Sequence, residues 1–160
     1  MKNERLGDMK KLLCLLACIL GLVACDNLEG SDNGDFDGMW QLAQVDSIDK
    51  NISIDVRERQ IYWCVQGNML DMRDHLLENG DGHSPLIFRF EFVSDTLHVT
   101  TPFLNYRREQ DPSPTSPKAT ESYGLNGLEE AFLVRQLSAS KMVLETCRQH
   151  ENVRMHFRKY

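Results

Sequence analysis

Apolar and polar residues alternate with a period of two over much of the sequence beyond residue 36. In the segment 86–93, Leu86, Phe88, Phe90 and Phe92 fall on one face, and charged residues stand between the last three. Successive side chains of a β-strand point to opposite faces, so this pattern predicts a strand with one buried face. The next segment, 95–103, follows the same pattern, with a face made of Leu97, Val99, Thr101 and Phe103.

Similar short runs recur along the chain, separated by turn residues such as those at Ser94 and Gly67. Many short antiparallel strands predict an all-β fold, and closure into a barrel removes the exposed edges of an open sheet. We therefore predict an eight-stranded antiparallel up-and-down barrel. A single helix over 128–137 remains an alternative for one segment because Glu129 and Ala131 favour helix. The eight strand candidates lie at 39–45, 61–65, 69–74, 86–93, 95–103, 132–137, 142–144 and 153–157.

The chain begins with a segment of a different kind. Lys10 and Lys11 precede an uncharged apolar run at 12–24, which is shorter than the roughly 20 residues that a membrane-spanning helix needs. This arrangement is typical of a secretory signal peptide. A translation start at Met9 in place of Met1 would also fit.

The end of the apolar run, Leu22-Val23-Ala24-Cys25, resembles the bacterial lipobox. This resemblance implies cleavage between Ala24 and Cys25, acylation of Cys25 and attachment to a membrane through lipid. Several acyl chains give lasting attachment, whereas one chain does not. We therefore expect a signal peptide at 1–24, a lipidated cysteine with a flexible polar tether at 25–36, and a barrel domain at 37–160.

Net charge limits the partners that we expect, and the lipobox-like segment limits the location. The formal net charge is −6, which argues against nucleic acid as the main partner because phosphate binding needs clustered lysine and arginine. The resemblance to a lipobox implies a location in a Gram-negative cell envelope, and we expect the outer membrane. Asp26 and Glu29 resemble sorting signals of two different kinds, so the membrane leaflet stays open.

The tripeptide Gly38-Met39-Trp40 at the start of the first strand resembles the lipocalin signature. The strands near the end of the chain also look like those of lipocalin-like lipoproteins of the Bacteroidota, a group with few assigned activities. The resemblance covers 38–160 and implies that Trp40 closes the base of the barrel. It also implies that a basic residue of the last strand packs over the Trp40 ring. We assign this role to Arg158, with Lys159 as the alternative.

Residues suited to catalysis or metal binding are scarce. The histidines lack the spacing of a zinc site, and no nucleotide-binding or nucleophile motif occurs. The best local cluster is Asp71, Asp74 and His75, where carboxylates could orient a histidine for acid–base chemistry or hold a metal. A solvated strand end explains the same residues. We therefore expect no enzymatic activity, no metal and no cofactor.

Two further features have alternative explanations. The segment 109–124 carries three prolines and predicts either a disordered loop or a lid over one end of the barrel. Cys64 and Cys147 predict either a disulfide or two separate thiols. Aromatic side chains either line a cavity for a small apolar ligand or fill the interior; they are Trp63, Phe88, Phe90, Phe92, Phe103 and Phe132.

The sequence therefore leads to three functional hypotheses. In the first, a membrane-anchored, non-enzymatic envelope lipoprotein binds a small apolar ligand inside its barrel. In the second, the core is filled and the protein is an interaction module for other envelope proteins. In the third, Asp71, Asp74 and His75 form the site of a hydrolase or a metal ion.

Overall fold

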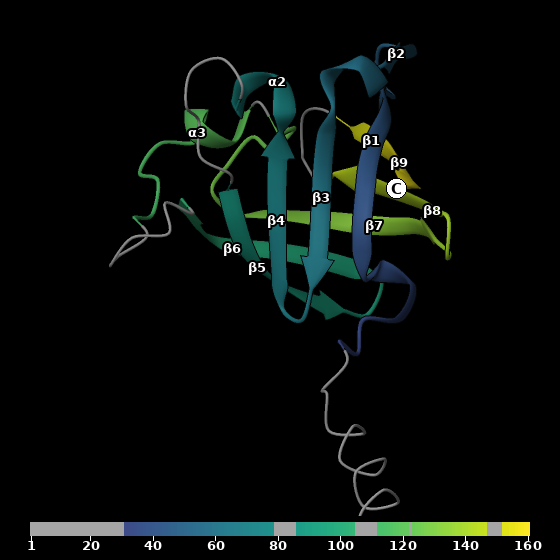
Figure 1. The fold of residues 1–160 in the computed structure, drawn as a ribbon. Coiled ribbons are helices and arrows are strands. Elements are labelled where there is room, and N and C mark those ends of the chain that lie inside the picture. Colours follow the sequence, from purple (N-terminus) through teal and green to yellow (C-terminus); the bar gives the residue numbers. More distant parts are fainter. Residues whose placement is uncertain (1–30, 79–85, 105–111, 122, 147–151) are drawn as a thin grey trace, which may run out of the picture. The chain divides into compact units, whose positions relative to one another are not determined.

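Antiparallel strands follow one another along the chain in the computed structural model, which describes residues 31–78, 86–104, 112–121, 123–146 and 152–160 (Figure 1). Residues Ser31–Tyr160 belong to one compact unit. Short helical turns connect some of the strands: η1 (Gly34–Phe36), η2 (Arg57–Arg59), α2 (His75–Glu78) and α3 (Lys118–Glu121). The strands are β1 (Gly38–Ser47), β2 (Ile52–Asp55), β3 (Ile61–Gln66), β4 (Met69–Asp74), β5 (Leu86–Val93), β6 (Thr96–Leu104), β7 (Glu130–Leu137), β8 (Lys141–Thr146) and β9 (Val153–Lys159).

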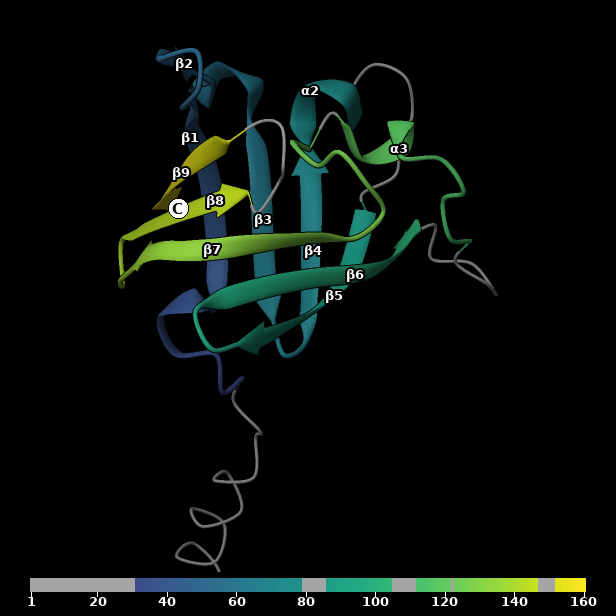
Figure 2. The same ribbon diagram turned by 180° about the vertical axis from the view of Figure 1, so that it is seen from behind.

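The sheet closes on itself because β9 pairs with β1. The first half of β1 pairs with β3 and its second half with β2, so β2 and β3 act as one barrel strand interrupted at η2. The result is a closed eight-stranded antiparallel barrel, which confirms the predicted fold class. Figure 2 shows from behind how β6, β7 and β8 form the opposite wall. The helical alternative for 128–137 is wrong, because β7 pairs with both β6 and β8.

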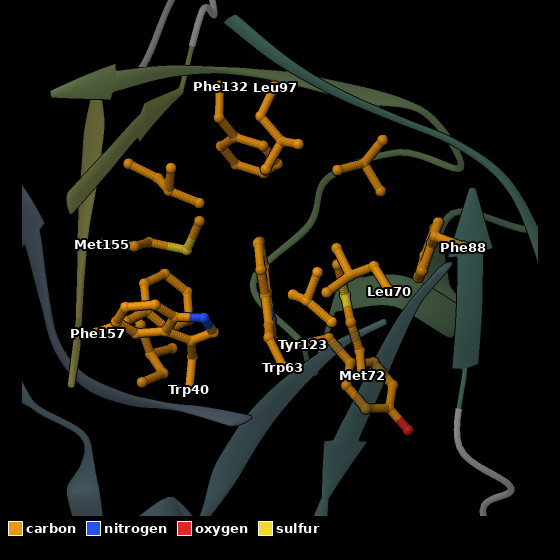
Figure 3. Close-up of a cluster of buried hydrophobic side chains, with 14 of the residues drawn as sticks. Trp40, Trp63, Leu70, Met72, Phe88, Leu97, Tyr123, Phe132, Met155 and Phe157 are labelled. Atoms are coloured by element: carbon orange, nitrogen blue, oxygen red, sulfur yellow. The ribbon is translucent and has the colours of Figure 1, made fainter. Parts of the chain in front are cut away.

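Side chains that alternate inward from the strands form one buried core (Figure 3). Trp63 on β3 contacts Phe132 on β7, with 5.7 Å between the ring centroids, and Phe157 on β9 at 4.8 Å. β3 and β7 face each other across the barrel, since β4–β6 separate them on one side and β1, β9 and β8 on the other. These aromatic contacts therefore bridge the full width of the interior.

The alternation of β6 breaks at Thr101, which has a positive φ of 50°. The register between β5 and β6 shifts at the same place, as in a β-bulge. Beyond the bulge Pro102 is buried, whereas Phe103 pairs with Ile87 and lies outside the core. The prediction that Thr101 and Phe103 share the inner face of Leu97 and Val99 is therefore wrong.

The segment before β1 closes one end of the barrel. Phe36 of η1 is fully buried, and its ring centroid lies 5.1 Å from that of Phe90 and 5.0 Å from that of Phe92. Ser31 accepts a hydrogen bond from the backbone N–H of Gly67 at 2.9 Å. Residues 31–36 thus pack against the barrel, and the part of the expected tether that they cover belongs to the folded unit. Residues 25–30 lie outside the described residues.

The connection between β6 and β7 covers the other end, where α2 and α3 lie (Figure 1). Tyr123 and Leu125 are buried in the core, exposed by only 3% and 1%. The buried hydroxyl of Thr120 donates to the carbonyl oxygen of Pro117 at 2.7 Å and holds the turn. Of the two predictions for 109–124, the described part favours the cover; residues 109–111 and 122 lie outside the described residues.

Candidate functional site

The indole of Trp40 is the centre of the barrel base. It is fully buried, and its Nε1 donates to the carbonyl oxygen of Phe36 at 2.7 Å. The ammonium of Lys159 lies 4.3 Å from the ring centroid, within the range of a cation–π contact. The same ammonium donates to the carbonyl oxygens of Asp35, at 2.9 Å, and of Asp37. The segment before β1 is thereby fastened to the last strand.

Gly38 makes this arrangement feasible. Its φ is +108°, a conformation that side chains rarely adopt, and a Cβ here would lie 3.0 Å from the Lys159 Cε. The glycine of the Gly-x-Trp tripeptide is thus required both by the backbone and by the approach of the lysine.

The assignment of Arg158 to the Trp40 ring is wrong, and Lys159 takes that place. Met155 and Phe157 are buried, so the alternation of β9 turns Lys159 inward and Arg158 outward. Arg158 lies on the outer face, where its Nε donates to the side-chain oxygen of Gln41 at 2.8 Å. The period-two pattern of β9 in the sequence already indicates that Lys159, and not Arg158, shares a face with Met155 and Phe157.

The six aromatic residues predicted to meet a ligand do not form one group. Trp63, Phe88 and Phe132 expose none of their surface, and Phe90 exposes 8%. Phe92 is 38% exposed at the base, and Phe103 lies outside the core. Because Trp63, Phe88 and Phe132 retain no accessible surface, they line no water-sized space, and the barrel around them is filled.

Among the described core residues, Trp63 carries a polar atom without a partner. The Nε1 of Trp63 is buried and forms no hydrogen bond. A buried donor without an acceptor costs about 1–3 kcal/mol. This donor is the one feature of the described core that favours a polar group inside the barrel.

The cluster of Asp71, Asp74 and His75 does not converge. Asp71 pairs with Cys64 in the sheet and forms an ion pair with Arg73 on the outer face. Asp74 is fully buried and accepts a hydrogen bond from the Arg59 guanidinium at 2.9 Å. His75 packs its ring against Tyr62, with centroids 5.1 Å apart. Among the residues that the structure describes, no three potential ligands gather into a metal site.

Among the described residues, two sets line pockets that open on the outer face. The first has a volume of about 630 Å³ and lies beside Cys64, Asp71 and Arg73. The second has a volume of about 570 Å³ and is lined by Gln41, Asp55, Arg57, Glu58 and Arg158. The sequence prediction missed the second pocket because its residues come from β1, β2, η2 and β9 and meet only when the barrel closes.

Charged groups in the second pocket hold each other in place. The Arg57 guanidinium donates to the Asp55 carboxylate through its Nε at 3.0 and 2.9 Å. These hydrogen bonds, with a backbone N–H of Arg57, lower the pKa of Asp55 to about 2. The Asp55 carboxylate in turn raises the pKa of Arg57. Both groups are therefore charged at neutral pH.

The sequence is similar to a known protein family. A model of the lipocalin-like domain matches residues 19–160. The chain belongs to the lipocalin-like domain family. A barrel of this family is a fold suited to ligand binding and is generally non-enzymatic, while the comparison itself identifies no ligand.

Two crystal structures resemble this lipocalin-like chain. A lipocalin-like protein from Bacteroides uniformis is 23% identical, with a TM-score of 0.56, and the match covers 79% of this chain and 100% of that one. An uncharacterized protein from Bacteroides eggerthii is 18% identical, with a TM-score of 0.51, and the match covers 78% and 99%. At these identities the likeness concerns the fold. No curated protein matches the sequence.

Several predicted features fall outside the described residues, among them Ala24, Cys25 and Cys147. The described helices include none that is long and apolar enough to cross a membrane.

Proposed function

We propose that this lipocalin-like chain is a membrane-anchored lipoprotein of the cell envelope that acts by binding and not by catalysis. In this proposal the filled barrel is a rigid scaffold, and the outer surface is the binding face. The observation that carries it is the contact of Trp63 with Phe132 across the barrel. Side chains that meet in this way occupy the space that an interior ligand would need.

The anchor rests on Leu22-Val23-Ala24-Cys25 and on the apolar run before it. Replacing Cys25 with serine removes the thiol that would carry the lipid. We expect the wild-type chain to incorporate radiolabelled palmitate in a Gram-negative host and to sediment with membranes, and Cys25→Ser to do neither. Cys64→Ser is the matched control and keeps both properties. Labelling of both variants alike would reject lipidation at Cys25.

The filled interior is tested with an apolar probe. Oleate is titrated into purified residues 26–160 while tryptophan fluorescence is recorded. A scaffold with an occupied core gives no saturable quenching. Saturable quenching at one equivalent would instead show that a fatty chain enters the barrel, and the scaffold proposal would be rejected.

A second candidate function, binding of a small apolar ligand inside the barrel, is favoured by the unpartnered Nε1 of Trp63. An oxygen at the polar end of such a ligand would satisfy this donor once the cover at Tyr123 opened. Under this candidate oleate binds to the wild-type chain and binds more weakly to Trp63→Phe, which lacks the N–H. Under the scaffold proposal neither chain binds oleate.

A further inference from the structure

The second pocket lies within a row of outward-facing side chains at one level of the barrel. Gln41 on β1 is the register partner of Tyr62 on β3 and of Arg158 on β9. The pocket opens beside Gln41 and Arg158, with Asp55, Arg57 and Glu58 around it. Polar groups from four separate elements therefore face one hollow of about 570 Å³.

Gln41 fixes the floor of this pocket. It is only 4% exposed, and its Nε2 donates to the carbonyl oxygen of Arg57 at 3.0 Å. Its Oε1 accepts from the Nε of Arg158 at 2.8 Å. One buried amide thus ties η2 to the last strand. The Gln41 amide and the Arg158 guanidinium are therefore held in place before any ligand arrives, which lowers the entropic cost of binding.

An aromatic pair stands beside the polar residues. The ring centroids of Tyr62 and Tyr160 lie 5.3 Å apart, in an edge-on arrangement. Tyr160 is 73% exposed. Because Tyr62 neighbours Gln41 in the sheet, the pair offers an apolar surface next to the pocket.

The charges of the pocket cancel. Asp55 and Glu58 are acidic, Arg57 and Arg158 are basic, and Asp55 already engages Arg57. A pocket of this kind has little preference for an anion or a cation. It offers many donors and acceptors at close spacing to a ligand that carries both, with an aromatic surface alongside.

We propose that this pocket binds an uncharged saccharide. Hydroxyl groups of a sugar both donate and accept, so they suit the mixed carboxylate and guanidinium groups of the pocket. The C–H face of a sugar ring packs on aromatic rings, which Tyr62 and Tyr160 supply. This inference rests on the proposed function, because it gives the outer surface of the scaffold its ligand.

Affinity electrophoresis of the full chain in non-ionic detergent tests the proposal. Native gels contain a soluble neutral polysaccharide (dextran, galactomannan or arabinoxylan), the charged polymer polygalacturonate, or no polymer. We expect slower migration in at least one neutral gel and unchanged migration with polygalacturonate. Tyr160→Ala and Arg158→Ala should each weaken the retention by about tenfold.

Arg89→Ala is the matched control, because Arg89 is an exposed arginine on β5 that is absent from the pocket lining. Relative to its own migration in the polymer-free gel, it should be retained as strongly as the wild type. Unchanged migration in every neutral gel would overturn the proposal. Retention that survives both Tyr160→Ala and Arg158→Ala, or retention by polygalacturonate alone, would overturn it too. None of these results contradicts the scaffold proposal, whereas saturable oleate quenching rejects it. The two proposals therefore fail separately.

Discussion

Trp40 shows how single residues close the barrel base. The Nε1–H of Trp40 donates to the Phe36 carbonyl oxygen, and the Lys159 ammonium lies over the Trp40 ring. Gly38 has no side chain and therefore leaves room for the lysine. None of these contacts is large alone. Together they bind the start of the folded unit to its last strand, so a change at one position should be felt at the others.

The first prediction compares Lys159→Met with Arg158→Met. Methionine retains most of the apolar stem, so the difference isolates the ammonium, its contact with Trp40 and its hydrogen bonds to two carbonyl oxygens. We expect Lys159→Met to lower the free energy of unfolding by about 1–2 kcal/mol, measured by urea denaturation. Arg158→Met removes only the hydrogen bond to Gln41 and should lower it by less, about 0.5–1 kcal/mol. The reverse order would mean that Arg158, and not Lys159, supports the base.

The second prediction concerns Gly38→Ala, with Gly67→Ala as its control. Both glycines have positive φ, but a Cβ on Gly67 meets nothing within 4 Å, whereas one on Gly38 meets Lys159. Gly67→Ala should lose about 1 kcal/mol from backbone strain. Gly38→Ala should lose more, because its φ of +108° lies outside the left-handed helical region and because the lysine is displaced. Thermal denaturation measures both. Equal losses would show that Lys159 moves away without cost.

At the scale of elements, period-two alternation predicted the strands well because each pairs along a half-buried wall. It failed at Thr101, where a non-glycine residue with positive φ turns Phe103 outward. A local pattern contains no sign of such a bulge, because the extra residue is set by the pairing of β6 with β5. It also missed Phe36, whose polar neighbours hid a buried ring, and the outer pocket, whose residues lie far apart in the sequence.

The third prediction belongs to the wall of β7, β8 and β9. Glu145 on β8 accepts hydrogen bonds from Arg135 on β7 and from Arg154 on β9, each with a shortest distance of 2.8 Å. The hydrogen bond from Arg135 is the largest cause that lowers the pKa of Glu145, from 4.5 to about 2. Because the folded pKa lies below the unfolded one, the stabilisation is complete above pH 4.5 and is lost as the pH falls toward 2.

Urea denaturation of the wild type and of Glu145→Gln between pH 2.5 and pH 7 checks this prediction. At neutral pH we expect the variant to be less stable by about 1–2 kcal/mol, below the full linkage value because both arginines are partly exposed to solvent. The gap should narrow as the pH falls below 4.5. A gap that stays constant with pH would show that the carboxylate charge contributes nothing. Glu91→Gln, on an exposed part of β5, is the matched control.

At the scale of the whole molecule, the barrel is closed at both ends by segments outside its strands. Phe36 seals the base, while Tyr123 and Leu125 enter the core from the connection between β6 and β7. These buried residues come from parts of the sequence with few apolar residues. The filled interior therefore depends on these buried side chains at the two ends as well as on the strands. Replacing one of them tests whether the barrel is a closed scaffold.

The fourth prediction concerns the removal of one of these buried side chains, Tyr123. Tyr123 is 3% exposed, so Tyr123→Ala leaves a cavity at the end of the core and should lower the free energy of unfolding by about 2–4 kcal/mol. Tyr160→Ala is the matched control, since this ring is 73% exposed and its loss should cost less than about 0.5 kcal/mol. Urea denaturation measures both. Equal stability of the two variants would mean that the cover is not docked. Saturable oleate quenching by Tyr123→Ala, but not by the wild type, would identify this cover as the barrier to the interior.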